Sequence, residues 1–242
     1  AGGAATQAGI EATQAATGGR FDTGEVALAG AMGGAGQAVT RIPQMVRAVR
    51  WSAALFAGFL LITHQVIING PLIEIDKWIH NLERPEFRGV SGFIIRRLDD
   101  LGLRGVTATA LLIAAFYIAR RFKTWRPLNL AILSLISLNV VVGLFKFGLG
   151  RTKPKVGIDL LHFGGMSYPS GHASNALLTW GVLAYLIYRY AHVDRYRGRL
   201  ASAGVAAISL TVCIVSLIRD THWFSDLLGG LFIGGALLVL VI

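Results

Sequence analysis

Two histidines and an aspartate are the residues of this chain whose types and spacing could do chemistry. His222 and Asp226 are four residues apart, so on a helix they share a face, and the carboxylate can accept a hydrogen bond from one imidazole nitrogen. That bond would set the tautomer and leave the other nitrogen free to attack. The second histidine, His172, could donate a proton to a leaving oxygen when it is charged.

The residues before His172 predict a helix start that can bind an anion. Pro169, Ser170 and Gly171 form a turn directly before an apolar stretch. The first amides of a helix have no partner within the helix and lie at its positive end, which suits a phosphate group. We therefore expect Ser170 and the Gly171 amide to donate to phosphate oxygens. A plain helix start with Ser170 as its cap is the alternative.

A basic cluster completes the set. Lys146 lies near the end of an apolar stretch, where a charge facing lipid would be costly. Arg151 and Lys153 follow shortly after it. Placed opposite two histidines, these cations would clamp a phosphate. Together the three clusters predict a site that holds a phosphate group and cuts it from its ester.

The composition indicates a membrane protein. The chain has 242 residues, of which 54% are hydrophobic and 15% charged, and its mean hydropathy is +0.58. These values are rare in soluble domains. The net charge of +10 points to anionic lipid headgroups and an anionic substrate rather than nucleic acid, because the basic residues flank apolar stretches. The single cysteine, Cys213, excludes an internal disulfide and a thiolate metal site.

The apolar stretches predict an all-α fold, a bundle of six transmembrane helices, because each is close to the roughly 20 residues that a span requires. A further amphipathic helix is expected along the membrane surface within residues 72–82. The expected spans are Trp51–Asn69, Gly105–Ala119, Leu128–Leu149, Ala173–Tyr190, Leu200–Ile218 and Ser225–Ile242.

The charge pattern predicts the orientation. Basic clusters near residues 41–50, 120–126 and 195–199 fall on one side of a six-span chain, and the positive-inside rule makes that side cytoplasmic. The three chemical clusters then meet on the extracytoplasmic side. We expect a multi-pass protein of a bacterial inner (plasma) membrane. Residues 1–50 would form an Ala/Gly-rich cytoplasmic tail, mobile or loosely helical over 1–40 and without a signal peptide, and 51–242 the six-span domain.

The three clusters resemble the signature of the type 2 phosphatidic acid phosphatase (PAP2) superfamily, in its integral-membrane lipid phosphatase branch. The family pattern is Lys, six residues, Arg-Pro; then Pro-Ser-Gly-His; then Ser-Arg, five residues, His, three residues, Asp. The second motif is complete here, and the third keeps His222 and Asp226 at the family spacing. The resemblance covers about residues 50–242, and order, spacing and topology agree.

Two positions depart from the family pattern. Lys153 stands where the first motif has Arg, which keeps the charge but loses the two-pronged guanidinium. Ser216 stands where the third motif has Arg. Arg151 and Arg219 are nearby replacements, and Arg219 lies within one helical turn of Ser216.

The resemblance implies a mechanism without metal or other cofactor. His222 would attack phosphorus and form a phosphohistidine, which Asp226 supports, and His172 would protonate the leaving group and then activate water. Fixed cations would neutralise the transition-state charge. The residues expected to bind phosphoryl oxygens are Lys146, Arg151, Lys153, Ser170, Gly171 and Arg219.

Alternatives remain at this point. His172, His222 and Asp226 could form a metal site, although the surrounding cations would repel a metal ion. The chain could also be a non-catalytic membrane subunit or lipid-binding protein with the same fold, or a lipid phosphotransferase. The expected partners are membrane lipids and a lipid phosphate or diphosphate, such as a polyprenyl phosphate; the sequence indicates no nucleic acid and identifies no protein partner.

Overall fold

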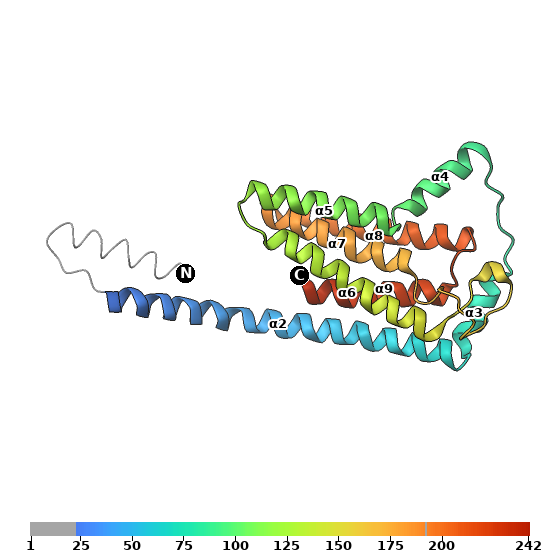
Figure 1. Ribbon diagram of the computed structural model, residues 1–242, viewed down its shortest axis with the longest axis horizontal. Helices are drawn as coiled ribbons and strands as arrows, with labels where there is room; N and C mark the ends of the chain where they lie inside the picture. The colour runs from blue at the N-terminus through green and yellow to red at the C-terminus, as the bar shows by residue number, and fades with distance from the viewer. Residues whose placement is uncertain (1–22, 192) are drawn as a thin grey trace. The chain divides into compact units, whose positions relative to one another are not determined.

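The computed structural model describes residues 23–191 and 193–242, with side chains from residue 44 onward. The chain divides into two units, which meet between Arg50 and Trp51. The described residues contain helices and no strand (Figure 1). The helices are α2 (Thr23–Ile67), α3 (Pro71–His80), α4 (Gly89–Asp100), α5 (Arg104–Arg121), α6 (Arg126–Leu149), the 3₁₀ turn η1 (Pro154–Val156), α7 (Gly171–Tyr190), α8 (Arg195–Ile218) and α9 (Phe224–Val241).

Local signals account for several helix ends. The side chain of Ser170 accepts a hydrogen bond from the amide of Ala173 at the start of α7. The side chain of Asp194 accepts one from the amide of Arg197 at the start of α8. Helix α6 ends at Gly150, whose φ of 54° is left-handed, a conformation that glycine adopts without steric cost. The start of α7 and the end of α6, which both lie at the candidate site, are thus specified by residues next to them in the sequence.

By length and composition, four helical segments of the described residues could cross a membrane, and a fifth if the bent pair α4 and α5 is counted as one span. The four are Gln44–Ile67, Arg126–Val156, Arg195–Ile218 and Phe224–Val241. The expected count of six is therefore not reached. The segment expected as the fourth span is a helix, α7, but its crossing stays a prediction.

Helix α7 is enclosed by its neighbours. It packs against α5, α6, α8 and α9 (Figure 1), so its polar residues Ser174, Asn175 and Thr179 are buried in protein. Its contact with α9 is close. A Cβ at Gly230 would lie 2.6 Å from the carbonyl oxygen of Ser170. Small residues of this kind let two helices approach closely, and here they bring His172 and His222 together.

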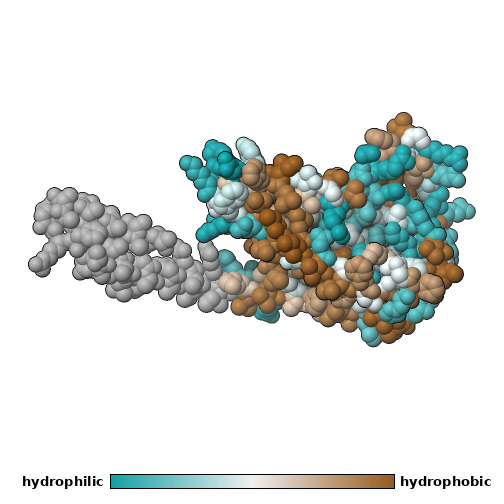
Figure 2. Space-filling model, in the orientation of Figure 1, coloured by the Kyte–Doolittle hydropathy of each residue, from teal (hydrophilic) through white to brown (hydrophobic). Residues whose placement is uncertain are grey.

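The two ends of residues 51–242 differ in charge. The rings of Phe122 and Tyr190 are 5.2 Å apart, so the basic linkers before α6 and before α8 lie at one end. The chemical clusters lie at the other, about 27 Å away along α7 at 1.5 Å per residue. An apolar surface separates these hydrophilic ends (Figure 2), and the spacing is close to the roughly 30 Å of a hydrocarbon core. Which end faces the cytoplasm stays a prediction.

A helix is present where the amphipathic one was expected, at Pro71–His80, but its buried face carries Asp76 as well as Ile73. Trp78 is 64% exposed. Its place at the membrane surface stays a prediction. In the N-terminal unit, residues 23–50 belong to α2. Residues 1–22 of the tail expected over residues 1–50 lie outside the described residues. So does His192, whose place between two apolar stretches predicts a surface residue.

Candidate active site

His222 and Asp226 form the pair that their spacing predicts. His222 Nδ1 lies 3.4 Å from Asp226 Oδ2, and both side chains are buried. Asp226 stands in the first turn of α9, where its Oδ2 also accepts from the Trp223 amide at 3.0 Å and from the Ser167 hydroxyl. Since Nδ1 faces the carboxylate, Nε2 is the nitrogen left for chemistry.

Arg151 holds this carboxylate from behind. Its guanidinium is fully buried, and all five N–H donors have partners: Asp159 at Nε and Nη2, Ser225 and Asp226 at Nη1, and Asp76 at Nη2. The bond to Asp226 Oδ1 is 2.8 Å long. This differs from the phosphate contact expected of Arg151, because no donor remains for a ligand. Arg151 positions the dyad.

Asp76 ties helix α3 to the same network. Its Oδ1 accepts from the Ser225 amide at 2.8 Å, and its Oδ2 accepts from Arg151 at 2.7 Å. Burial, opposed by the charge of Arg151, raises the pKa of the Asp76 carboxyl. The sequence predicted that this helix lies along the membrane surface and did not connect Asp76 with the site. Asp76 is 75 residues from Arg151 and belongs to no sequence motif.

His172 faces His222 across the site, with ring centroids 5.9 Å apart. Its Nε2 lies 3.9 Å from Asp99 Oδ2, and Asp99 also forms an ion pair with Arg219. His172 precedes the span expected at Ala173–Tyr190. Its pKa is lowered mainly by burial, with Asp99 opposing the shift and His222 and Arg219 adding to it.

The bend between α4 and α5 brings Asp99 to His172. A Cβ at Gly102 would lie 2.8 Å from the carbonyl oxygen of His172, so only glycine allows the bend to sit this close. The indole of Trp180 donates to the Leu101 carbonyl at 2.8 Å and secures the same bend. Sequence reasoning missed Asp99, because it belongs to no motif and only this packing gives it a role.

Lys146 lies beside the start of α7. Its Nζ donates to the carbonyl oxygens of Met166 and Ser167, and its Cε is the one heavy atom within 4 Å of a Cβ placed on Gly171. The charges acting on it include Asp226, Lys153 and Arg104. An anion between Lys146 and the α7 amides would meet a helix N-terminus and a fixed cation.

The remaining predicted residues are placed as follows. Ser170 is fully buried and caps α7, as the alternative interpretation had it. Lys153 is exposed. Ser216 is buried and its hydroxyl lies 3.4 Å from Asp99. The sequence places His80 between two apolar stretches and so predicts a surface residue; in the structure it is half-buried, and its Nδ1 lies 3.0 Å from Asp220.

The donor geometry does not favour a metal centre. Among residues 23–191 and 193–242, no group of three or more His, Cys, Asp or Glu side chains is arranged to hold a metal ion. Asp226 already accepts from Arg151, Ser167 and the Trp223 amide. Fixed cations surround both histidines. The arrangement suits an anion, with a nucleophile and a second imidazole on either side of it.

Comparison with known proteins finds a family match for the segment that contains this site. Residues 127–242, which hold every motif residue, match the PAP2 superfamily. The matched segment, a little under half of the chain, is called the PAP2 domain below. The resemblance seen in the motifs is thereby confirmed, and the PAP2 domain includes helices α7 to α9 and both histidines.

Relatives of the PAP2 domain support this assignment. Phosphatidylglycerophosphatase B of Bacillus subtilis (strain 168) is 28% identical over 119 residues, which are 49% of this chain and 58% of that protein. The aligned part thus spans less than two thirds of that relative. The crystal structure of a transmembrane PAP2 type phosphatidylglycerolphosphate phosphatase from Bacillus subtilis matches with a TM-score of 0.69 at 22% identity, covering 78% of this chain and 93% of that one. The structural match shows a shared fold.

Proposed function

We propose that this chain is a membrane-embedded lipid phosphate phosphatase that forms a phosphohistidine on His222 and needs no metal. The observation that carries the proposal is the pair of imidazoles 5.9 Å apart, of which one is backed by a buried carboxylate. A phosphoryl group between them would meet a nucleophile on one side and a proton donor on the other.

The first step transfers the phosphoryl group. His222 Nε2 attacks phosphorus, the bond from phosphorus to the lipid oxygen breaks, and His172 gives its proton to that oxygen. Asp226 holds the Nδ1 proton and stabilises the positive charge that develops on His222. Lys146 and the first amides of α7 neutralise the phosphoryl oxygens, which is the main contribution expected for this reaction.

The second step regenerates the enzyme. His172, now neutral, takes a proton from water, the oxygen of that water attacks phosphorus, and the bond to His222 breaks. Inorganic phosphate leaves, and each histidine returns to its starting protonation state. The charge on Lys146, Lys153 and Arg219 supplies what a divalent metal supplies in other phosphoryl-transfer sites.

The substrate proposed first is phosphatidylglycerophosphate, because both relatives are named for it. The test is phosphate release by the purified full chain in detergent with EDTA present, from phosphatidylglycerophosphate, phosphatidate and a polyprenyl diphosphate. We expect release without metal, no release by His222→Ala, and normal release by His64→Ala, an exposed histidine of α2.

Four outcomes would change the proposal. A strict requirement for divalent metal would overturn the metal-free mechanism. Release by His222→Ala at a near-normal rate would overturn the nucleophile. Phosphate that moved to an added lipid alcohol in preference to water would make the chain a phosphotransferase. No turnover of any lipid phosphate would favour a non-catalytic membrane protein.

A further inference from the structure

A second concave surface lies at the other end of the PAP2 domain. Helices α8 and α9 both pack along α7 but make few contacts with each other, so a groove remains between them with α7 as its floor. Its volume is about 590 Å³, within the range of roughly 300–1,000 Å³ typical of small-molecule sites. Its residue Tyr185 is about 20 Å along α7 from His172, at 1.5 Å per residue. The groove is therefore separate from the candidate active site.

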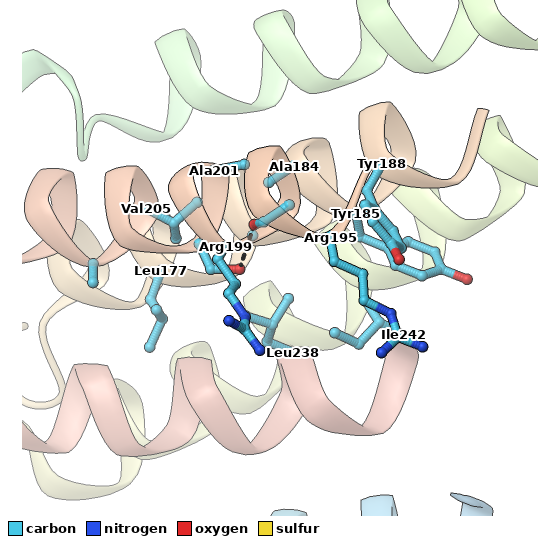
Figure 3. A pocket seen from close by; sticks show the side chains of 14 residues that line it. Leu177, Ala184, Tyr185, Tyr188, Arg195, Arg199, Ala201, Val205, Leu238 and Ile242 are labelled. Carbon is cyan, nitrogen blue, oxygen red and sulfur yellow. Dashed lines mark hydrogen bonds between the residues drawn. The ribbon is translucent and has the colours of Figure 1, made fainter. Parts of the chain in front are cut away.

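Small side chains keep the groove open, and its walls are apolar. Gly181 and Ala184 of α7 and Gly198 and Ala201 of α8 line it, and Figure 3 shows Ala184 and Ala201. The side chain of Leu238 packs against Gly181, and the ring of Tyr188 packs against Gly198. Leu177, Val205 and Leu238 complete the lining. A surface of this kind within the apolar part of the protein fits a hydrocarbon chain.

Two arginines close one end of the groove. Arg195 and Arg199 are four residues apart on α8, and Figure 3 shows both side chains extending from α8 toward α9. Neither forms an ion pair with a described residue, whereas Arg197, on another face of the helix, pairs with Asp194 at 3.6 Å. Arg195 also lies in the first turn of α8, where the helix dipole disfavours a cation. A ligand with negative charge would offset that cost.

We propose that this groove binds one acyl chain of an anionic phospholipid, with its phosphate on Arg195 and Arg199, in the leaflet opposite the candidate active site. Charge complementarity selects the lipid class: the two cations fit one phosphodiester, and Tyr185 and Tyr188 also line the groove. A free phosphate would leave the apolar walls unused, and a neutral lipid would leave the arginines unpaired. The proposal does not depend on the proposed phosphatase activity.

The test is cross-linking of a phosphatidylglycerol that carries a photoactivatable group in its acyl chain. The purified full chain is labelled in detergent, and the cross-linked peptides are mapped by mass spectrometry. We expect labels within residues 177–206. The double variant Arg195→Gln/Arg199→Gln should reduce them about tenfold or more, since each basic residue near a membrane surface strengthens binding to anionic lipid.

Matched controls separate the possible results. Arg197→Gln removes a neighbouring charge outside the groove and should leave the labelling unchanged. Ala201→Phe fills the groove and should abolish it, with the melting temperature confirming that the variant folds. Equal labelling by phosphatidylcholine, competition by inorganic phosphate alone, or labels confined to peptides around His172 and His222 would each overturn the proposal.

Discussion

The two halves of the candidate site use the same three residue types in different ways. His222, Asp226 and Arg151 have side chains that are 6%, 0% and 0% exposed. His172, Asp99 and Arg219 have side chains that are 30%, 10% and 31% exposed. One histidine belongs to a closed network, and the other to an open one.

This difference matches the two roles proposed for the histidines. A nucleophile must keep one tautomer and one orientation, which the saturated bonds around Asp226 ensure. A group that gives and takes a proton must reach both the leaving oxygen and water, so it requires some exposure. Arg219 has only one nitrogen in its ion pair with Asp99, which leaves donors for a phosphate. Arg151 has none.

The largest expected effect lies at the nucleophile. His222→Ala should abolish turnover and remove any acid-labile phosphoenzyme, because no other imidazole occupies its position. His172→Ala should slow turnover of lipid esters yet still form a phosphoenzyme when the leaving group is good, since the proton is then less needed. Rapid-quench labelling with radioactive phosphate measures both. Equal loss of the phosphoenzyme in the two variants would contradict the division of roles.

The next effect lies in the closed network and concerns stability. Arg151→Met leaves three carboxylates around an apolar side chain, and breaking a buried ion pair from one side costs about 3–5 kcal/mol. Denaturant unfolding in detergent measures the change. The control is Arg88→Met, since Arg88 forms an exposed pair with Glu86, and such pairs contribute little. Similar losses in the two variants would show that the buried network is not a structural element.

A smaller, purely kinetic effect is expected in the open half. Arg219→Ala should lower kcat/KM about ten- to a hundredfold. A charge-assisted hydrogen bond to phosphate contributes about 1.5–3 kcal/mol, which corresponds to a loss of that size. Its melting temperature should stay close to that of the native chain, because the side chain is partly exposed. A variant with normal kcat/KM would show that Arg219 serves only to hold Asp99.

The smallest effect should appear in the pH profile. Asp99 raises the pKa of His172 against the lowering effect of burial. Asp99→Asn removes that contribution, so the pKa of His172 falls further. As the pH rises, His172 then loses its proton at a lower pH than in the native chain. The basic limb of kcat/KM against pH should therefore move to lower pH. A limb that moved upward, or stayed in place, would mean that Asp99 does not act on His172.

The sequence predicted the helices and the dyad well, because both depend on local order. Apolar stretches of span length became helices, and an i, i+4 pair on one helix became His222 and Asp226 in contact. The PAP2 resemblance rested on the same short spacings and was confirmed. The count of six spans was not reached among the described residues, where α7 carries the buried polar residues Ser174, Asn175 and Thr179 as well as buried apolar ones.

The roles of the arginines could not be read from the sequence. Arg151 and Arg219 both lie near the motif positions where family members carry arginine. Arg151 is enclosed by carboxylates from α3, from α9 and from the loop between η1 and α7, whereas Arg219 pairs with a carboxylate of α4. Charge alone predicts attraction to phosphate for both. Which cation remains free depends on which carboxylates arrive beside it.

By itself, the sequence determined the all-α class, the family and the histidines that face each other, since hydrophobic length, helical periodicity and motif spacing are local properties. Only the tertiary structure decided the partners of Arg151, the approach of Asp99 to His172 and the groove that ends at Arg195 and Arg199. Each of these depends on how whole helices pack side by side. Such contacts are set by close packing, as at Gly102 and Gly230, and packing leaves no period in the sequence.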